Sequence, residues 1–220
     1  PDLDATLGGE LREHFGNALQ RDQRNISLRH LLQMRSGLAF DEGAFYEKAS
    51  ARVATQGYSA TLASYTQQDL TSLGLGLPMD YRPGEAWSYS TMDSQLLSAA
   101  FSALTGQSLE DYASQRLFPA LGIDDWNWPA DASGVSLGGM GLELTPRDMA
   151  KFGFLYLNRG TWDDQELLRP DWVRLSTTPQ SSGVDAGSGQ TVPIEWYGMQ
   201  WWTWKPELFG GQRAIAAQGY

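Results

Sequence analysis

Apolar residues recur at intervals of three and four along much of the chain, and this spacing predicts α-helices. The clearest run ends at Gly106, a residue type that often terminates helices, and its apolar positions are Met92, Leu96, Leu97, Ala100, Phe101 and Leu104. Residues 1–24 are polar and irregular and predict no regular element. Other apolar runs predict helices within residues 27–37, 43–56, 66–74, 108–118 and 145–160, and from residue 170 onward.

Three of the predicted helices have start signals that do not depend on apolar spacing. Ser27 precedes the first run as a capping hydroxyl. Thr66, with Asp69 three residues later, offers a capping pattern for the helix within 66–74. Thr145 precedes a proline at the first helical position, and Asp148 follows three residues after this cap.

The character of the chain changes towards its end. Residues 178–193 are rich in serine, glycine and proline and predict a loop. Residues 196–204 and 213–217 are dominated by aromatic and apolar residues and predict two strands of a hairpin. Helices followed by strands predict an α+β fold, mainly helical over residues 1–160 and with a helix, a loop and sheet strands over 161–220.

Composition narrows the function classes. The chain has 220 residues, no cysteine and a formal net charge of -10. This acidic balance argues against a nucleic-acid partner, because phosphate binding requires a basic face. Without cysteine the chain forms neither a disulfide nor a thiolate metal site. No apolar run reaches the roughly 18 residues that a membrane-spanning helix needs.

The segment 134–138 (GVSLG) matches the Gly-x-Ser-x-Gly turn that carries the nucleophile in one class of hydrolases. That turn requires a preceding strand, a following helix and a histidine later in the chain. Here a second glycine-rich stretch follows, and both histidines, His14 and His30, lie upstream. We interpret the match as coincidental.

Three other groups of residues have both a functional and a structural interpretation. His14 and His30 are too far apart for a helical metal pair, so surface or packing roles are favoured. Asp41 and Glu42 could bind a cationic group of a substrate, although a solvated loop is the simpler interpretation. Four tryptophans near the end of the chain could form a stacking platform for sugars, but core packing is the favoured interpretation. They are Trp196, Trp201, Trp202 and Trp204.

Three segments resemble the β-lactamase-related serine hydrolases, which include class C β-lactamases and penicillin-binding proteins. Residues 26–38 (ISLRHLLQMRSGL) resemble a helix of that family, and residues 82–91 (RPGEAWSYST) resemble its Pro-Gly turn before a catalytic tyrosine. Residues 138–153 (GGMGLELTPRDMAKFG) resemble its glycine loop and the following helix. Residues 91–95 (TMDSQ) look most like the branch of 6-aminohexanoate-oligomer hydrolases and carboxylesterases.

The resemblance implies a mostly helical subdomain of the β-lactamase/transpeptidase fold together with part of its antiparallel sheet. It implies an enzyme whose serine forms an acyl-enzyme with a small ester or linear amide, without a metal or other cofactor. Tyr89 matches the catalytic tyrosine, and the Pro-Gly turn before it distinguishes it from an ordinary half-buried tyrosine. The candidate substrate contacts are Thr91, Gly138, Gly139 and Asp41.

Two positions qualify this resemblance. Thr91 stands where many members of the family have an asparagine, and this weakens the case for β-lactam turnover. Residues 216–220 look like the start of the family's edge-strand motif, so the backbone N–H of Tyr220 is the candidate second donor of an oxyanion hole.

The serine and lysine that the family uses are missing from the sequence. In the family they lie three residues apart on one helix, where they face the same side and share a proton. The three lysines here, Lys48, Lys151 and Lys205, follow phenylalanine, aspartate and tryptophan at that spacing. We therefore expect residues 1–220 to be a partial domain, with the nucleophile segment and the closing strands outside it, and to be inactive alone.

Two alternatives to a hydrolase stay open. One is a non-catalytic relative that keeps the cleft as a binding module, and the other is an aromatic-rich glycan-binding module. The sequence predicts neither the compartment nor the oligomeric state.

Overall fold

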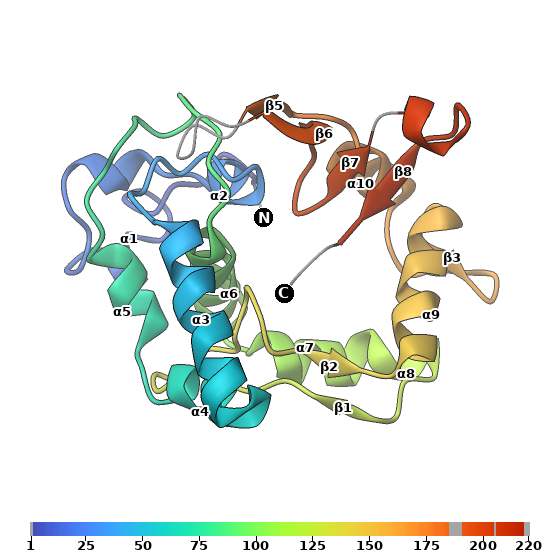
Figure 1. The fold of residues 1–220 in the computed structure, drawn as a ribbon, viewed down its shortest axis with the longest axis horizontal. Coiled ribbons are helices and arrows are strands. Elements are labelled where there is room, and N and C mark those ends of the chain that lie inside the picture. Colours follow the sequence, from blue (N-terminus) through green and yellow to red (C-terminus); the bar gives the residue numbers. More distant parts are fainter. Residues whose placement is uncertain (1, 185–190, 205, 218–220) are drawn as a thin grey trace.

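The computed structural model describes residues 2–184, 191–204 and 206–217. Figure 1 shows the N-terminal helices on one side of the molecule. The four-stranded sheet lies on the other side, with helices α9 (Pro146–Leu157) and α10 (Pro170–Ser176). The predicted α+β class is confirmed, because every strand of this sheet follows residue 180.

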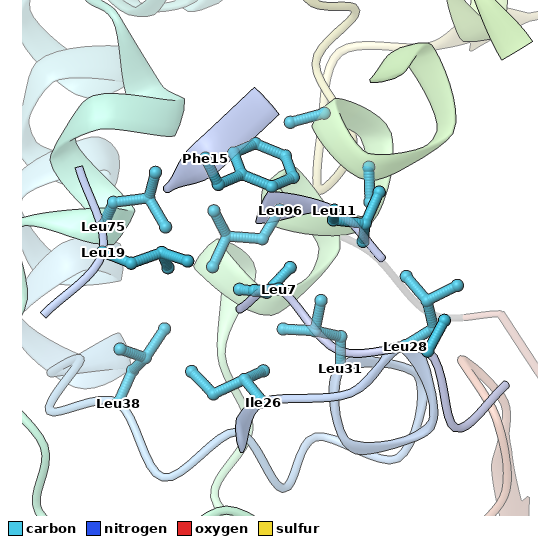
Figure 2. Packing of buried hydrophobic residues seen from close by; sticks show 13 residues of the cluster. Leu7, Leu11, Phe15, Leu19, Ile26, Leu28, Leu31, Leu38, Leu75 and Leu96 are labelled. Atoms are coloured by element: carbon cyan, nitrogen blue, oxygen red, sulfur yellow. The ribbon is translucent and has the colours of Figure 1, made fainter. Parts of the chain in front are cut away.

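The N-terminal segment is not irregular, and that prediction was wrong. It contains α1 (Arg12–Phe15) and a 3-10 helix (Asp22–Asn25), and the Leu7 N–H donates to the Ile26 carbonyl at 2.9 Å. Figure 2 shows its apolar side chains converging on one cluster, to which it contributes Leu7, Leu11, Phe15 and Leu19. These four side chains are four residues apart and are separated mostly by polar residues and glycines, so the sequence shows no continuous apolar run. They become buried because the segment packs against later elements of the chain.

Helix α2 (Leu28–Leu32) begins where predicted and ends earlier than predicted. The Ser27 hydroxyl accepts a hydrogen bond from the His30 N–H, and His30 Nδ1 accepts one from the Ser27 N–H, both at 3.2 Å. This reciprocal cap fixes the start of the helix. The helix stops before Ser36 because Met34 adopts a left-handed backbone conformation with φ of 56°.

A helical hairpin follows, formed by α3 (Glu42–Gln56) and α4 (Tyr58–Thr66). Gly57 separates the two helices with φ of +87°. Thr66 was predicted to cap the next helix but is the last residue of α4. Asp69 caps α5 (Leu70–Leu75) instead, because its carboxylate accepts a hydrogen bond from the Ser72 N–H at 2.8 Å.

The strongly periodic helices match their predictions. They are α6 (Thr91–Thr105), α7 (Leu109–Arg116) and α9, and a short α8 (Phe118–Leu121) continues α7. A second hydrophobic core lies among α7, α8 and α9 and buries Ala113, Phe118, Leu121, Ile123 and Leu155. Two small two-stranded antiparallel sheets adjoin it, β1 (Trp126–Asn127) with β2 (Glu143–Leu144), and β3 (Thr161–Trp162) with β4 (Gln165–Glu166).

The sheet is antiparallel in the order β5 (Ser181–Val184), β6 (Thr191–Tyr197), β7 (Trp202–Trp204) and β8 (Ala214–Ala216). A second 3-10 helix (Pro206–Phe209) precedes β8. The predicted loop 178–193 therefore contains β5 and the start of β6, since backbone pairing tolerates serine and glycine.

The predicted single strand 196–204 is two strands joined by a turn. Within this turn the Gly198 N–H donates to the Trp201 carbonyl at 2.8 Å. Gln200 has a left-handed φ of 62°. None of the described helices combines the length and apolar character that crossing a bilayer requires.

Candidate active site

Tyr89 lies where the Pro-Gly turn meets the first turn of α6. Gly84 in this turn has φ of +82°, and a Cβ there would lie 2.9 Å from His30 Nε2. The turn therefore packs directly on α2, and this contact requires glycine. Ser90 caps α6 by accepting a hydrogen bond from the Asp93 N–H at 3.3 Å. Tyr89 is thus held between two fixed points, which orients its side chain.

The ring of Tyr89 packs against the sheet. It stacks on Trp202 with ring centroids 4.9 Å apart and meets Tyr197 edge-on at 6.2 Å. Burial and the charge of Glu42 raise the pKa of Tyr89 to about 12, and a hydrogen bond with Tyr46 offsets part of this rise. The Tyr89 phenol is therefore protonated near neutral pH.

Glu42 is the functional candidate that the sequence interpretation treated as solvated. Its two carboxylate oxygens accept hydrogen bonds from Thr91, one from the N–H at 2.7 Å and one from the hydroxyl at 2.6 Å. Burial, together with the charges of Tyr89 and Glu42, raises the pKa of Tyr46. Glu42 therefore ties the start of α3 to the start of α6, and Tyr46 links it to Tyr89. No sequence signal marks this pairing across 49 positions.

Asp93 is fully buried one turn into α6. Its carboxylate accepts hydrogen bonds from the Ser36 hydroxyl at 2.6 Å and from the Ser36 N–H at 3.3 Å. Burial is the largest influence and raises the pKa of Asp93 to about 7, against the hydrogen bonds from Ser36 and Ser90. Asp93 therefore joins α6 to the segment after α2 as a carboxyl group that titrates near neutral pH.

This burial predicts that the contribution of Asp93 to the stability of the protein falls as pH rises from about 4 to about 7. The folded state holds the Asp93 proton over that range while the unfolded state has released it. The slope from one such group is at most about 1.4 kcal/mol per pH unit. We expect the free energy of unfolding of the full-length protein, relative to its Asp93→Asn variant, to drop by ~1–2 kcal/mol between pH 5 and pH 7 in urea titrations. A difference that stays constant over this range would show that Asp93 is ionised throughout.

The glycine loop packs against α6 at very short range. A Cβ on Gly138 would lie 2.2 Å from the Ser94 carbonyl oxygen, and one on Gly139 would lie 2.8 Å from the Thr91 Cγ2. The Gly138 N–H donates to Gln95 Oε1 at 2.9 Å. Gly139 and Thr91 therefore lie side by side near Tyr89, whereas Gly138 faces the middle of α6.

A buried carboxylate holds the preceding loop. Asp131 accepts hydrogen bonds from the backbone N–H groups of Leu70, Ser133 and Val135 at 2.9–3.1 Å. Gln95 Nε2 also donates to it at 3.4 Å. Asp131 and Gln95 thus form one network that fixes the approach to the glycine loop.

The remaining site predictions have separate outcomes. Tyr46, Tyr89 and Tyr197 form a tyrosine cluster, and Asp41 lies outside it as the exposed N-cap of α3. Its carboxylate accepts a hydrogen bond from the Ala44 N–H at 2.8 Å. Tyr220 lies outside the described residues. Ser136 of the rejected Gly-x-Ser-x-Gly match is buried, with its hydroxyl bonded to the Glu110 N–H at 3.3 Å. That serine is therefore not presented as a nucleophile.

Two of the tryptophans have structural roles. Trp201 is buried and stacks on Phe152 of α9 at 6.3 Å, and Trp202 packs against Tyr89 and Trp87, in agreement with the favoured packing interpretation. The side chain of Trp196 lies outside the described part. In the part of the chain that the structure describes, no three His, Cys, Asp or Glu side chains gather as a metal site would require.

A mainly helical region beside a four-stranded antiparallel sheet agrees with the β-lactamase fold that the resemblance implied. The Beta-lactamase family model matches residues 2–219, and the chain belongs to this family.

Solved structures share the fold at low sequence identity. A D-stereospecific amidohydrolase from Streptomyces is 18% identical with a TM-score of 0.68, over 100% of this chain and 68% of its own. A Bacillus anthracis protein described as a 6-aminohexanoate-dimer hydrolase is 20% identical with a TM-score of 0.69, over 92% of this chain and 52% of its own. An octameric penicillin-binding protein homologue from Pyrococcus abyssi is 18% identical with a TM-score of 0.64, over 98% and 50%. The chain therefore spans about half to two thirds of these proteins.

Proposed function

We propose that the full-length protein is a serine hydrolase that forms an acyl-enzyme with small esters or linear amides, and that Tyr89 is one of its catalytic residues. The observation that carries this proposal is the Tyr89 phenol, fixed at the start of α6 and stacked on Trp202. The membership of the chain in the Beta-lactamase family supports the reaction class.

The nucleophile and its base come from a segment outside this sequence. No serine stands three residues before Lys48, Lys151 or Lys205, and the similar structures extend well beyond the matched region. A serine hydroxyl is a weak nucleophile without a neighbouring base, so we propose that the serine and its lysine lie on the same segment.

An uncovered apolar cavity supports this arrangement. It measures about 810 Å³ and lies between α2, α6 and α10. Large exposed apolar surfaces mark interaction sites, so we propose this cavity as a contact for the segment that carries the serine. Its apolar lining includes Leu3, Leu28, Leu32, Leu97, Phe101 and Leu104.

The proposed reaction has two steps. The serine oxygen attacks the carbonyl carbon, its proton passes to the neighbouring lysine, and the leaving alcohol or amine departs with a proton from the Tyr89 phenol. Water then attacks the acyl-enzyme and gives a proton to the Tyr89 phenolate, while the serine oxygen leaves with the proton held by the lysine, so that the acid is released and the enzyme is restored. The N–H of the nucleophile and the N–H of Tyr220 are the proposed donors to the oxyanion.

Labelling of the full-length protein with a fluorophosphonate tests this function. We expect the intact mass to exceed 24.3 kDa and to increase by one adduct, with the label on the serine of a Ser-x-x-Lys sequence. Replacement of that serine by alanine should abolish both labelling and ester hydrolysis. A natural protein of 24.3 kDa that takes no label would contradict the proposal and favour a binding module.

A further inference from the structure

The α3–α4 hairpin presents two mainly apolar stripes that line a pocket, and most of their residues are exposed or only half-buried. The stripe on α3 comprises Tyr46, Ala49, Ser50, Val53 and Ala54, and that on α4 comprises Tyr58, Thr61, Leu62 and Tyr65. Both follow the spacing of one helix face. Yet α3 buries none of its residues and α4 buries only Thr61.

The two stripes enclose a pocket of about 340 Å³. Helices α3 and α4 are consecutive in the chain and lie together in Figure 1. Phe45 and Tyr65, which both line the pocket, have ring centroids 5.4 Å apart, and Arg52 donates a hydrogen bond to the Ser64 hydroxyl between the helices. This volume lies at the lower end of the range for small-molecule sites. The hairpin is therefore built as the wall of a small pocket.

The base of this pocket belongs to the proposed catalytic site. Thr91 and Gly139 line it, and so does Tyr46, which hydrogen bonds with Tyr89. A molecule in the pocket is therefore within one side chain of the proposed proton donor. The pocket and the site can hold two parts of one substrate.

The chemistry of the lining selects among substrates. Among the described residues that line the pocket, none carries a charge. At its base the Glu42 carboxylate bonds to Thr91. The negative charge of Glu143 acts on Tyr58 of the lining, and the positive charge of Arg52, which is bonded to the Ser64 hydroxyl, acts on Tyr65. An anionic group would lose its hydration here and meet a carboxylate, whereas a neutral apolar group would lose little.

We propose that this pocket binds a neutral apolar or aromatic substituent of the substrate, and that it disfavours substrates with a carboxylate in that position. The proposal rests on the proposed hydrolase function for its substrate. Occupancy of the pocket by a neutral apolar group can be measured independently of turnover.

Matched ester pairs test the proposal in the full-length enzyme. Ethyl 4-phenylbutyrate and 4-phenylbutyl acetate each extend ethyl acetate by an aromatic group, on the acyl and the alcohol side respectively. For each extended ester we compare its kcat/KM with that of ethyl acetate. Ala49→Phe should fill the pocket and lower this ratio by about tenfold or more for at least one of the two extended esters. Ala51→Phe places the same group on an exposed position of α3 outside the lining and should leave both ratios unchanged.

Binding of two related dyes gives a second readout that needs no nucleophile. N-phenyl-1-naphthylamine is neutral, and 1-anilinonaphthalene-8-sulfonate has the same rings with an added negative charge. We expect the neutral dye to bind more tightly, and Ala49→Phe or Ala54→Phe to weaken it about tenfold or more, with Ala51→Phe unchanged.

The outcomes separate this proposal from the proposed function. If Ala49→Phe and Ala54→Phe change neither the ratios of kcat/KM for the esters nor the affinity for the neutral dye, the pocket proposal is overturned even in an active hydrolase. Equal affinity of the parent for the two dyes would also overturn it. If the two variants lose affinity for the neutral dye but the full-length protein takes no fluorophosphonate label, the pocket proposal stands and the hydrolase proposal is rejected.

Discussion

Replacement of Tyr89 by phenylalanine in the full-length protein is expected to lower kcat/KM for an ester by about 10²- to 10⁴-fold. The variant keeps the ring that stacks on Trp202 and loses only the hydroxyl that we propose protonates the leaving group. This phenol carries its proton near neutral pH, so the substitution removes the proposed proton donor. Ester hydrolysis at pH 7 measures the effect.

Tyr112→Phe is the matched control for this variant. Tyr112 lies on α7, with 43% of its surface exposed, and its ring contacts Phe101 rather than the tyrosine cluster. We expect this control to retain full activity, and both variants to bind N-phenyl-1-naphthylamine normally. Activity of Tyr89→Phe within about threefold of the parent would be too small a loss for general acid catalysis and would remove Tyr89 from the mechanism.

Replacement of Gly138 by alanine is expected to lower the free energy of unfolding by about 3 kcal/mol or more. The added methyl group would lie 2.2 Å from the Ser94 carbonyl oxygen and 2.8 Å from its carbon. These are backbone atoms of α6, so no rotamer change relieves the clash and the glycine loop must move. Urea unfolding of the full-length protein measures the loss.

Gly153→Ala provides the contrast, because it makes the same chemical change inside α9. A Cβ at Gly153 meets no atom within 4 Å, and alanine favours helix by about 1 kcal/mol over glycine. We expect this variant to be as stable as the parent or slightly more stable. If the free energy of unfolding of Gly138→Ala is within about 0.5 kcal/mol of that of the parent, the loop does not pack on α6 as described.

The displaced loop also links this variant to function. Gly139 and Thr91 share the base of the apolar pocket, so a shift of the loop would change the shape of that pocket. Gly138→Ala should therefore weaken binding of the neutral dye, whereas Gly153→Ala should not.

Local interactions made several parts of this protein predictable from its sequence. Helices α6, α7 and α9 follow their apolar spacing, and Ser27 and Thr145 cap where their hydroxyls predicted. These features depend on residues within one or two turns of each other, so the sequence specifies them directly. The Pro-Gly turn and the start of α6 also single out Tyr89 among the tyrosines, and its catalytic role stays a prediction.

The sequence by itself thus determined the α+β class, the main helices and the family to which the chain belongs. Only the tertiary structure decided that the N-terminal leucines form a core, that Glu42 bonds to Thr91 and that Gly138 touches Ser94. The physical reason is distance along the chain. These contacts join segments tens of residues apart, and their energy comes from burial and close approach, which no local pattern of polar and apolar residues records.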